Sequence, residues 1–471
     1  MPIGRMMQPQ RSYTQRVRVR PEQIEAKNAL SYAGDLLTFL IGFLSAFSIH
    51  IVGSLPLGEF MLVPLFPVLL STRGNRVLSA RMNPIYILLG AWLFSQIATD
   101  IYRSSPQESW MKGLAAIGFF IIDIISMVVL TQGKPLRQVI FLFGFSLGTI
   151  LAFKIQPSDI VLGDPWKFAL SSAVAGLLLL IGCYFYKRKN YAIVGLLVVI
   201  LIVLNLMFNY RSDVLFLLVL AVLVLPVVPE QIGRVRLLPH RRSTGRVVIL
   251  AGLALMAGAL TFLIISFVSK VGLAGEEAQE KNMHQLESKQ GILLSGRPEI
   301  LVSSKAVLDS PIIGHGSEAK DYKYVEMLYD IQIRNGGWMD LKDTENDSRG
   351  TIPTHSHLMG AWVSAGIFGA VFWVYLYVLV FRALVIVSLN RPAMAPIYAW
   401  ILIQMLWNII FSPFGSTVRI NEALAIIIIT DLLVETKSLM GTVKVTGRKW
   451  RRTQVRRTAA VAMQFPGQGQ A

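Results

Sequence analysis

Apolar stretches of about 20 residues recur along most of this chain, each long enough to cross the hydrocarbon core of a bilayer as a helix. Backbone polar groups in lipid must be paired within the protein, so only helices and closed barrels span membranes. The repeated pattern predicts an all-α polytopic membrane protein with about 12 transmembrane helices. The expected spans cover residues 31–52, 54–71, 84–102, 112–131, 138–153, 167–186, 191–209, 213–229, 247–268, 356–381, 393–412 and 420–434.

One long polar stretch interrupts this pattern between the ninth and tenth expected spans. Its charged part, residues 275–290, and the segment 298–308 are expected to form short helices, because apolar residues recur in the second at helical spacing. Asp309-Ser310-Pro311 ends that second helix, and the segment Ile312–Gly316 predicts a glycine turn. We expect the chemistry of the protein to be carried out on this large loop.

Composition and charge support the membrane class and set the expected orientation. The chain is 54% hydrophobic and 15% charged, whereas soluble domains carry about 25% charged residues. Arg and Lys gather in alternate segments between the spans, and the positive-inside rule places those segments in the cytoplasm. The expected organisation is a basic cytoplasmic segment at 1–30, nine helices within 31–268, a periplasmic catalytic loop at 269–355, three helices within 356–434 and a basic cytoplasmic tail at 435–471.

The net charge of +17 invites a role in binding nucleic acid, which the distribution of the charge argues against. The basic residues are spread over many inner loops, where anionic phospholipids are the expected partners. The polar residues before the first apolar run do not resemble a cleaved signal peptide. The lone Cys183 excludes an intramolecular disulfide and a cysteine-based metal site.

Three kinds of residue fall on the expected outer side of the membrane: Arg211 after the seventh span, Arg297 in the loop, and His355 and His357 where the loop returns to the membrane. A guanidinium offers a planar fork of donors that matches phosphate oxygens. Arg211 therefore has two interpretations, an anion clamp or a side chain that snorkels or pairs with Asp213. Arg297 precedes an expected helix start, where backbone N–H groups also favour anions.

The sequence does not predict a metal site or a cofactor. His355 and His357 stand two residues apart with no third ligand nearby, so a general base is the better interpretation of a histidine here. The acidic run Asp340–Asp347 lacks the glycine and the final carboxylate of a calcium loop, which favours a solvated turn.

The stretch Ser295–Phe372 resembles the bacterial O-antigen ligase and polymerase superfamily. That family shares a many-spanning helical fold, an arginine after a mid-chain span, and a long periplasmic loop with Gly-Arg, Pro then Gly-x-Gly, and a closing His motif before Gly-x-x-Gly. The matching residues here are Arg211, Gly296, Arg297, Pro311, Gly314, Gly316, His355, Gly366 and Gly369. The spacing to Gly366 selects His355 over His357 as the family histidine. The chain departs from the family at Ser356 (usually Asn), at Leu358 (usually aromatic) and at Ala365, and it lacks the tryptophan that often follows Gly-Arg.

The resemblance implies an inverting, metal-independent glycosyltransferase in the inner membrane of a bacterium. Its donor would be a glycan on undecaprenyl diphosphate, and its acceptor either another glycan or a lipid A-core sugar. Arg211 and Arg297 would stabilise the diphosphate and His355 would act as general base, while His357, Gly296, Gly314 and Gly316 would contribute to substrate binding.

Two choices stay open. The enzyme is either a polymerase of O-antigen or exopolysaccharide repeat units, which the divergent histidine motif favours slightly, or an O-antigen ligase; other polysaccharide assembly proteins are possible partners. A different class, a transporter or flippase of lipid-linked glycans, also suits 12 spans with cytoplasmic termini. A scaffold or receptor is the remaining alternative.

Overall fold

The computed structural model describes residues 21–50, 53–77, 79–226, 231–232, 235–236, 297–334 and 350–434, with six single residues between 252 and 267. Several expected features lie outside the described residues. They are the segment 1–20, most of the ninth span at 247–268, the charged segment 275–290, Gly296, the acidic run 340–347 and the tail 435–471.

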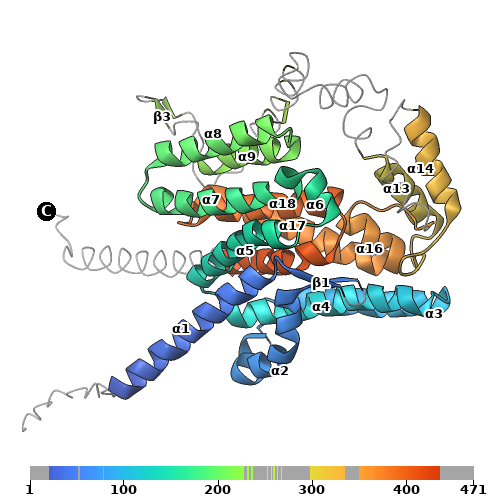
Figure 1. Cartoon of the computed structure of the whole chain (residues 1–471), viewed down its shortest axis with the longest axis horizontal. Coiled ribbons are helices and arrows are strands. Elements are labelled where there is room, and N and C mark those ends of the chain that lie inside the picture. The colour runs from blue at the N-terminus through green and yellow to red at the C-terminus, as the bar shows by residue number, and fades with distance from the viewer. Residues whose placement is uncertain are drawn as a thin grey trace, which may run out of the picture.

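The described chain is mainly helical (Figure 1). Its helices are α1 (Pro21–Leu44), α2 (Leu57–Val77), α3 (Asn83–Tyr102), α4 (Gln107–Thr131), α5 (Pro135–Ile155), α6 (Asp159–Gly163), the π-helical turn η1 (Trp166–Leu170), α7 (Ser171–Lys187), α8 (Tyr191–Met207), α9 (Arg211–Val224), α13 (Glu299–Asp309), α14 (Tyr322–Arg334), α16 (His357–Ala365), α17 (Ile367–Asn390), α18 (Ala395–Phe411) and a helix over residues 416–434. Two short antiparallel hairpins complete it: β1 (Ser48–His50) with β2 (Ser54–Pro56), and β3 (Gln231–Ile232) with β4 (Val235–Arg236).

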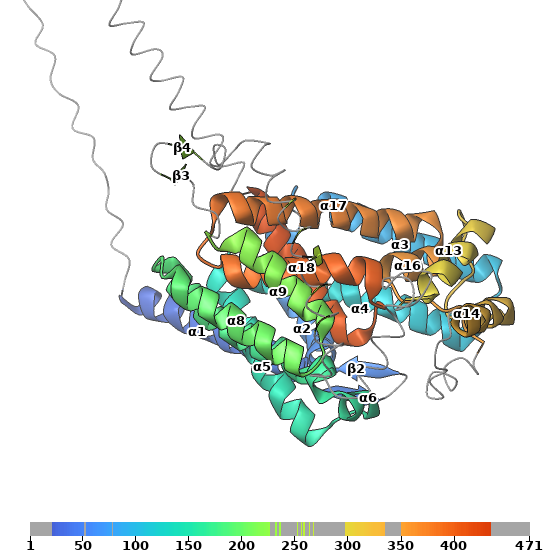
Figure 2. The same ribbon diagram turned by 90° about the horizontal axis from the view of Figure 1, so that it is seen from above.

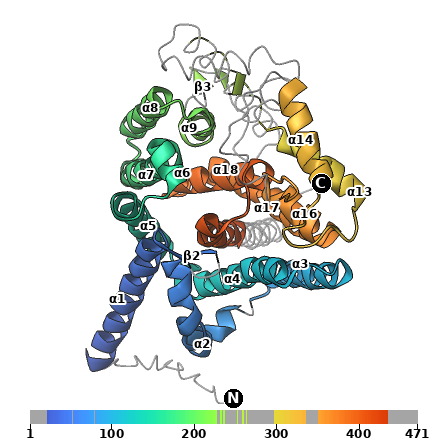
Figure 3. The ribbon, with the colours of Figure 1, turned by 45° about the vertical axis from the view of Figure 1, so that its right-hand side comes forward.

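Among the described residues, five helices are long and apolar enough to cross a membrane, which agrees with a helical membrane protein. They are Asn83–Tyr102, Gln107–Thr131, Pro135–Ile155, Trp166–Lys187 and Ile367–Asn390. Four shorter apolar helices accompany them at Ser31–Leu44, Leu57–Ser71, Tyr191–Met207 and Ala395–Phe411. The helix over residues 416–434 lies inside the bundle (Figure 3), and residues 423–429 are buried all round it.

The first and tenth expected spans are interrupted in the structure. The first was expected over 31–52, but α1 ends at Leu44 and the chain enters the β1–β2 hairpin. The tenth was expected as one helix over 356–381, but it breaks at Gly366, which has φ +69°. The glycine turn of the loop packs against this break: Ile367 N–H donates to the Ile312 carbonyl at 3.2 Å, leaving no room for a side chain at Gly366.

The loop contributes α13 and α14, which lie beside α16 and the end of α3 (Figure 2). The expected helix over 298–308 is confirmed, because α13 covers Glu299–Asp309 and its C-cap is Ser310. A second, small apolar core joins the three helices, with Val302 and Ala306 from α13, Tyr324 from α14 and Val363 from α16. The loop is thereby docked on the bundle at one end.

Candidate functional site

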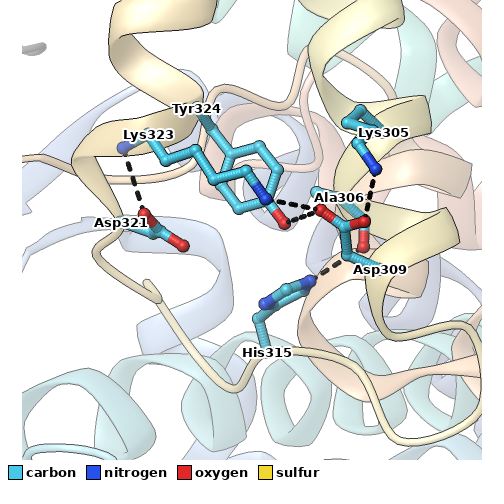
Figure 4. Close-up of polar contacts among 7 residues, drawn as sticks. All are labelled: Lys305, Ala306, Asp309, His315, Asp321, Lys323 and Tyr324. Carbon is cyan, nitrogen blue, oxygen red and sulfur yellow. Dashed lines mark hydrogen bonds and ion pairs between the residues drawn. The ribbon is translucent and has the colours of Figure 1, made fainter.

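Polar contacts within the loop tie α13 to α14 (Figure 4). Asp309 at the end of α13 accepts hydrogen bonds from Lys305 Nζ at 2.6 Å, Tyr324 Oη at 2.7 Å and Lys323 Nζ at 3.0 Å. The hydrogen bond from Lys305, then those from Tyr324 and Lys323, hold the pKa of Asp309 well below its usual range. His315 Nε2 donates to the Ala306 carbonyl at 2.8 Å, so the glycine turn folds back on α13.

His355 is the last residue before the cap of α16. Ser356 caps the helix: its Oγ accepts from the Met359 N–H at 3.1 Å and donates to the Ile409 carbonyl at 2.8 Å, which ties this point to α18. Serine is among the side chains that cap helices best. The serine at this position thus fixes the backbone beside His355 to the bundle.

The His355 imidazole is partly buried and lies close to two cations. Burial, and then the positive charges of Arg297 and Lys167, together lower the pKa of His355 to about 4. Both causes disfavour the imidazolium. His355 is therefore neutral at pH 7, and one nitrogen of a neutral imidazole is a proton acceptor.

Arg297 lies two residues before α13, at a helix start as predicted. Its charge acts on His355 and also on the Tyr210 hydroxyl, which stands in the turn between α8 and α9. The start of α13 therefore contacts α16 and lies within electrostatic range of the α8–α9 turn. Among the described residues, no hydrogen bond or ion pair to the Arg297 guanidinium is found.

Arg211 directly follows Tyr210 and is the first residue of α9. The structure shows no ion pair between Arg211 and Asp213; the buried Asp213 carboxylate accepts a hydrogen bond from Ser171 Oγ at 2.5 Å. Within the described part of the chain the Arg211 guanidinium has no hydrogen bond or ion pair. The charge of Arg297 reaches Tyr210, and no direct contact joins Arg211 to Arg297 or His355 in the described residues.

A buried hydrogen-bond network supports this side of the site. Asn205 of α8 accepts from Trp166 Nε1 at 2.9 Å and lies 3.0 Å from Ser171 Oγ, and its own amide donates to the Leu201 carbonyl at 3.0 Å. Trp166 also stacks on Phe208 with ring centroids 4.6 Å apart. The network joins η1 and α7 to the α8–α9 turn and holds Lys167, which is part of η1, near His355.

Sequence reasoning missed Lys167, which was expected to begin an ordinary span at 167–186. The structure places it in the π-helical turn η1, and single π turns inside helices often mark functional sites. The available signal was a lysine beside a tryptophan at the boundary of an apolar run. That signal is common in membrane proteins, where such residues anchor helix ends.

His357, expected to contact substrate, is fully buried inside the bundle. Its Nδ1 donates to the Ser412 carbonyl at 2.7 Å, and its Nε2 lies 3.4 Å from Glu422 Oε1. The rings of Trp373 and Phe414 close around it, with centroids 4.8 and 5.3 Å away. A side chain with no exposed surface has no access to a substrate, so the structure gives His357 a packing role instead.

Gly314 and Gly316 have φ of +85° and +96°, which confirms the expected glycine turn. Their backbones pack closely: a Cβ on Gly314 would lie 2.6 Å from the Gly366 nitrogen, and one on Gly316 would lie 2.5 Å from Ser105 Oγ. Both glycines are thus needed where the loop meets α16 and α3. Their expected part in substrate binding stays a prediction.

A partly buried neutral imidazole beside cations suits an anionic ligand and a proton transfer. Among the described residues, no group of three or more His, Cys, Asp or Glu side chains is arranged to hold a metal ion. No protein-family model matches the chain, and no curated protein matches it.

Proposed function

We propose that this protein is an inverting, metal-independent glycosyltransferase that uses a glycan on undecaprenyl diphosphate at the periplasmic face of the bacterial inner membrane. The observation that carries the proposal is the action of Arg297 on both His355 and Tyr210. It relates Arg297 of the loop to the neutral imidazole of His355 and to Tyr210, the residue before Arg211. A diphosphate beside these cations and a hydroxyl beside the imidazole would complete a transfer site.

The proposed reaction is a direct displacement. The acceptor hydroxyl oxygen attacks the anomeric carbon, its proton passes to a ring nitrogen of His355, and the bond from the anomeric carbon to the diphosphate oxygen breaks. The electron pair of that bond stays on the diphosphate, where Arg297, Arg211 and Lys167 stabilise the growing charge. Attack opposite the leaving group inverts the anomeric centre.

The acceptor distinguishes two versions of the same chemistry. A polymerase would extend a lipid-linked repeat unit of O-antigen or exopolysaccharide, and a ligase would glycosylate the lipid A-core. We favour the polymerase, because Ser356 and Leu358 differ from the histidine motif of the resembling family. Purified protein offered each acceptor in turn would separate them.

A flippase of lipid-linked glycans is the second candidate, favoured by a buried charge pair. Glu59 of α2 accepts hydrogen bonds from Arg419 Nη2 and, at 3.2 Å, from Arg419 Nε, and both side chains lie inside the bundle. Asp123 of α4 interacts electrostatically with both. Ionisable groups inside membrane proteins often mark transport pathways, although they also fix helix packing.

The deciding experiment uses proteoliposomes that contain the purified protein, an undecaprenyl-diphosphate-linked glycan and an acceptor glycan. We expect release of undecaprenyl diphosphate and a longer glycan, in EDTA as well as without it. The release should be lost in Arg297→Ala and kept in Arg334→Ala, whose arginine is exposed on α14. Movement of labelled lipid across the bilayer without bond transfer would overturn the transferase and support the flippase.

A further inference from the structure

The turn that follows α13 presents large apolar side chains to the outside of the molecule. Leu308 in the last turn of α13 is 74% exposed, Ile312 is 68% exposed, and the neighbouring Ile313 is also exposed. Single exposed apolar residues are common, but a contiguous group of them marks an interaction surface. We refer to Leu308, Ile312 and Ile313 as the apolar turn.

The apolar turn is held between the ends of two helices that can cross a membrane. On one side, Thr99 Oγ1 donates to the Ile313 carbonyl at 2.5 Å, and Thr99 belongs to the last turn of α3. On the other side, Ile367 N–H donates to the Ile312 carbonyl, and Ile367 begins α17. Both α3 and α17 are among the candidate membrane spans. The turn therefore lies level with the ends of these spans.

The side chains around the turn are those that occur at a membrane–water boundary. Tyr102 at the end of α3 is exposed, and the Arg103 guanidinium lies 5.6 Å from the centre of its ring. Trp362 Nε1 donates to the Pro311 carbonyl at 2.8 Å. Arg103 Nη2 donates to Ser310 Oγ at 2.8 Å, next to the turn. Tyr, Trp and Arg are enriched or tolerated at this depth because they join an apolar body to a polar tip.

We propose that the apolar turn inserts into the membrane, where it contacts the acyl chains of lipids at the boundary of the bilayer. The surface continues directly into α17, where Phe368, Val371 and Val374 are exposed along one face of an apolar helix. A face of that kind on a membrane-spanning helix contacts lipid, and the turn is bonded to its first residue. The loop is thus inserted in the membrane at the C-terminal end of α13. This inference does not depend on the glycosyl-transfer chemistry.

Membrane insertion of the apolar turn would also constrain the position of Arg297. α13 has 11 residues, so it is about 16 Å long, and it joins Arg297 at its start to the apolar turn at its end. Anchoring the far end of α13 in lipid would hold Arg297 at a set height relative to the bilayer. The lipid would then orient the loop, in addition to its contacts with α3 and α16.

Spin labelling in liposomes tests the proposal, and the chain suits it because its single cysteine, Cys183, is buried. Nitroxide labels would be attached separately at Leu308→Cys and Ile312→Cys. Power saturation would then measure access to oxygen, which concentrates in lipid, and to a water-soluble nickel chelate. Val378→Cys on the exposed face of α17 serves as the lipid reference, and Glu326→Cys, exposed on α14, as the water reference.

We expect the oxygen-to-nickel access ratio at both turn positions to be several-fold higher than at Glu326→Cys and to approach that at Val378→Cys. A ratio equal to that of Glu326→Cys would place the turn in water and overturn the proposal. Labels with little access to either reagent would show that protein covers the turn, from this chain or a second copy, and would overturn it equally. Leu308 and Ile312 are exposed, so either label is expected to leave the fold intact, and thermal unfolding of each variant checks this.

Discussion

His357 Nδ1 lies 2.7 Å from the Ser412 carbonyl oxygen, deep inside the bundle, whereas His355, two residues earlier, lies beside Arg297 and Lys167. The two histidines are close in sequence but have different surroundings. One joins α16 to the end of α18, and the other borders the cations of the candidate site. Their substitutions should therefore differ in kind.

Replacing His355 with Ala should abolish glycan transfer while the protein stays folded. A general base contributes about 10²–10⁴-fold in rate. His357→Ala should instead lower the thermal unfolding temperature, because it removes a buried hydrogen bond and leaves a void between Trp373 and Phe414. Transfer rates and unfolding curves of both variants check this. A stable, inactive His357→Ala beside an active His355→Ala would reverse the two roles.

Arg297→Ala and Arg211→Ala should each reduce transfer severely, because loss of one charged donor at a developing anion costs about 3–4 kcal/mol. Arg297→Lys and Arg211→Lys should recover activity only in part, since lysine lacks the planar fork of donors. Initial rates with a lipid-linked donor measure the effect, and Arg334→Ala is the matched control. Near-normal rates in both alanine variants would contradict the phosphate-binding role.

His355 should titrate at an unusually low pH. Its pKa is about 4 in the folded protein against about 6.5 in an unfolded chain, so its neutral form persists down to about pH 4. Between those two values the unfolded chain takes up the proton first, so His355 lowers the stability as the pH falls from about 6.5. Arg297→Gln should raise the pKa, because it removes a nearby positive charge. Carbon NMR of labelled histidine, with His355→Gln to assign the signal, measures both midpoints.

Addition of pyrophosphate should also raise the pKa of His355, because the anion would neutralise the nearby cations. Arg334→Gln should leave the midpoint unchanged. A midpoint near 6.5 in the unsubstituted protein would show that His355 is exposed to water and distant from Arg297.

Asn205→Ala should weaken both the fold and the site. The substitution leaves the Trp166 indole N–H without its acceptor, and hydrogen bonds of this kind in membrane proteins contribute about 0.6–1.7 kcal/mol. Donor affinity should fall too, because η1 and the α8–α9 turn lose their link. Asn190→Ala removes the cap at the other end of α8 and should affect stability alone. Equal donor affinity in Asn205→Ala and Asn190→Ala would show that the hydrogen-bond network of Asn205 does not support the site.

Glu59→Gln should destabilise the bundle strongly, because it leaves the buried Arg419 without its main partner. Breaking a buried ion pair by removing one member costs about 3–5 kcal/mol. Asp123 interacts with Arg419 as well, which places the expected loss at the lower end of that range. The double variant Glu59→Gln/Arg419→Met should lose less unfolding free energy than the sum of the losses in the two single variants. Unfolding in detergent would measure these losses. Additive losses would show that the two side chains do not stabilise each other.

The helical membrane class could be predicted from the sequence because it depends on local properties. Runs of apolar residues of sufficient length determine which segments can cross a bilayer, and the glycine turn and the end of α13 follow from residues with strong backbone preferences, such as Gly314 and Pro311. The break at Gly366 was missed, since a glycine within an apolar run is compatible with a continuous helix until a neighbouring segment packs against it.

The surroundings of each polar side chain depended on tertiary structure. His355 and His357 have the same local chemistry, and only the packing of α16 against α18 buries one and leaves the other beside Arg297. Lys167 and Arg297 belong to segments far from His355 in the chain, so no spacing in the sequence could join them to it. Contacts between distant segments decide burial and electrostatics, and these in turn decide which ionisable groups can act on one ligand.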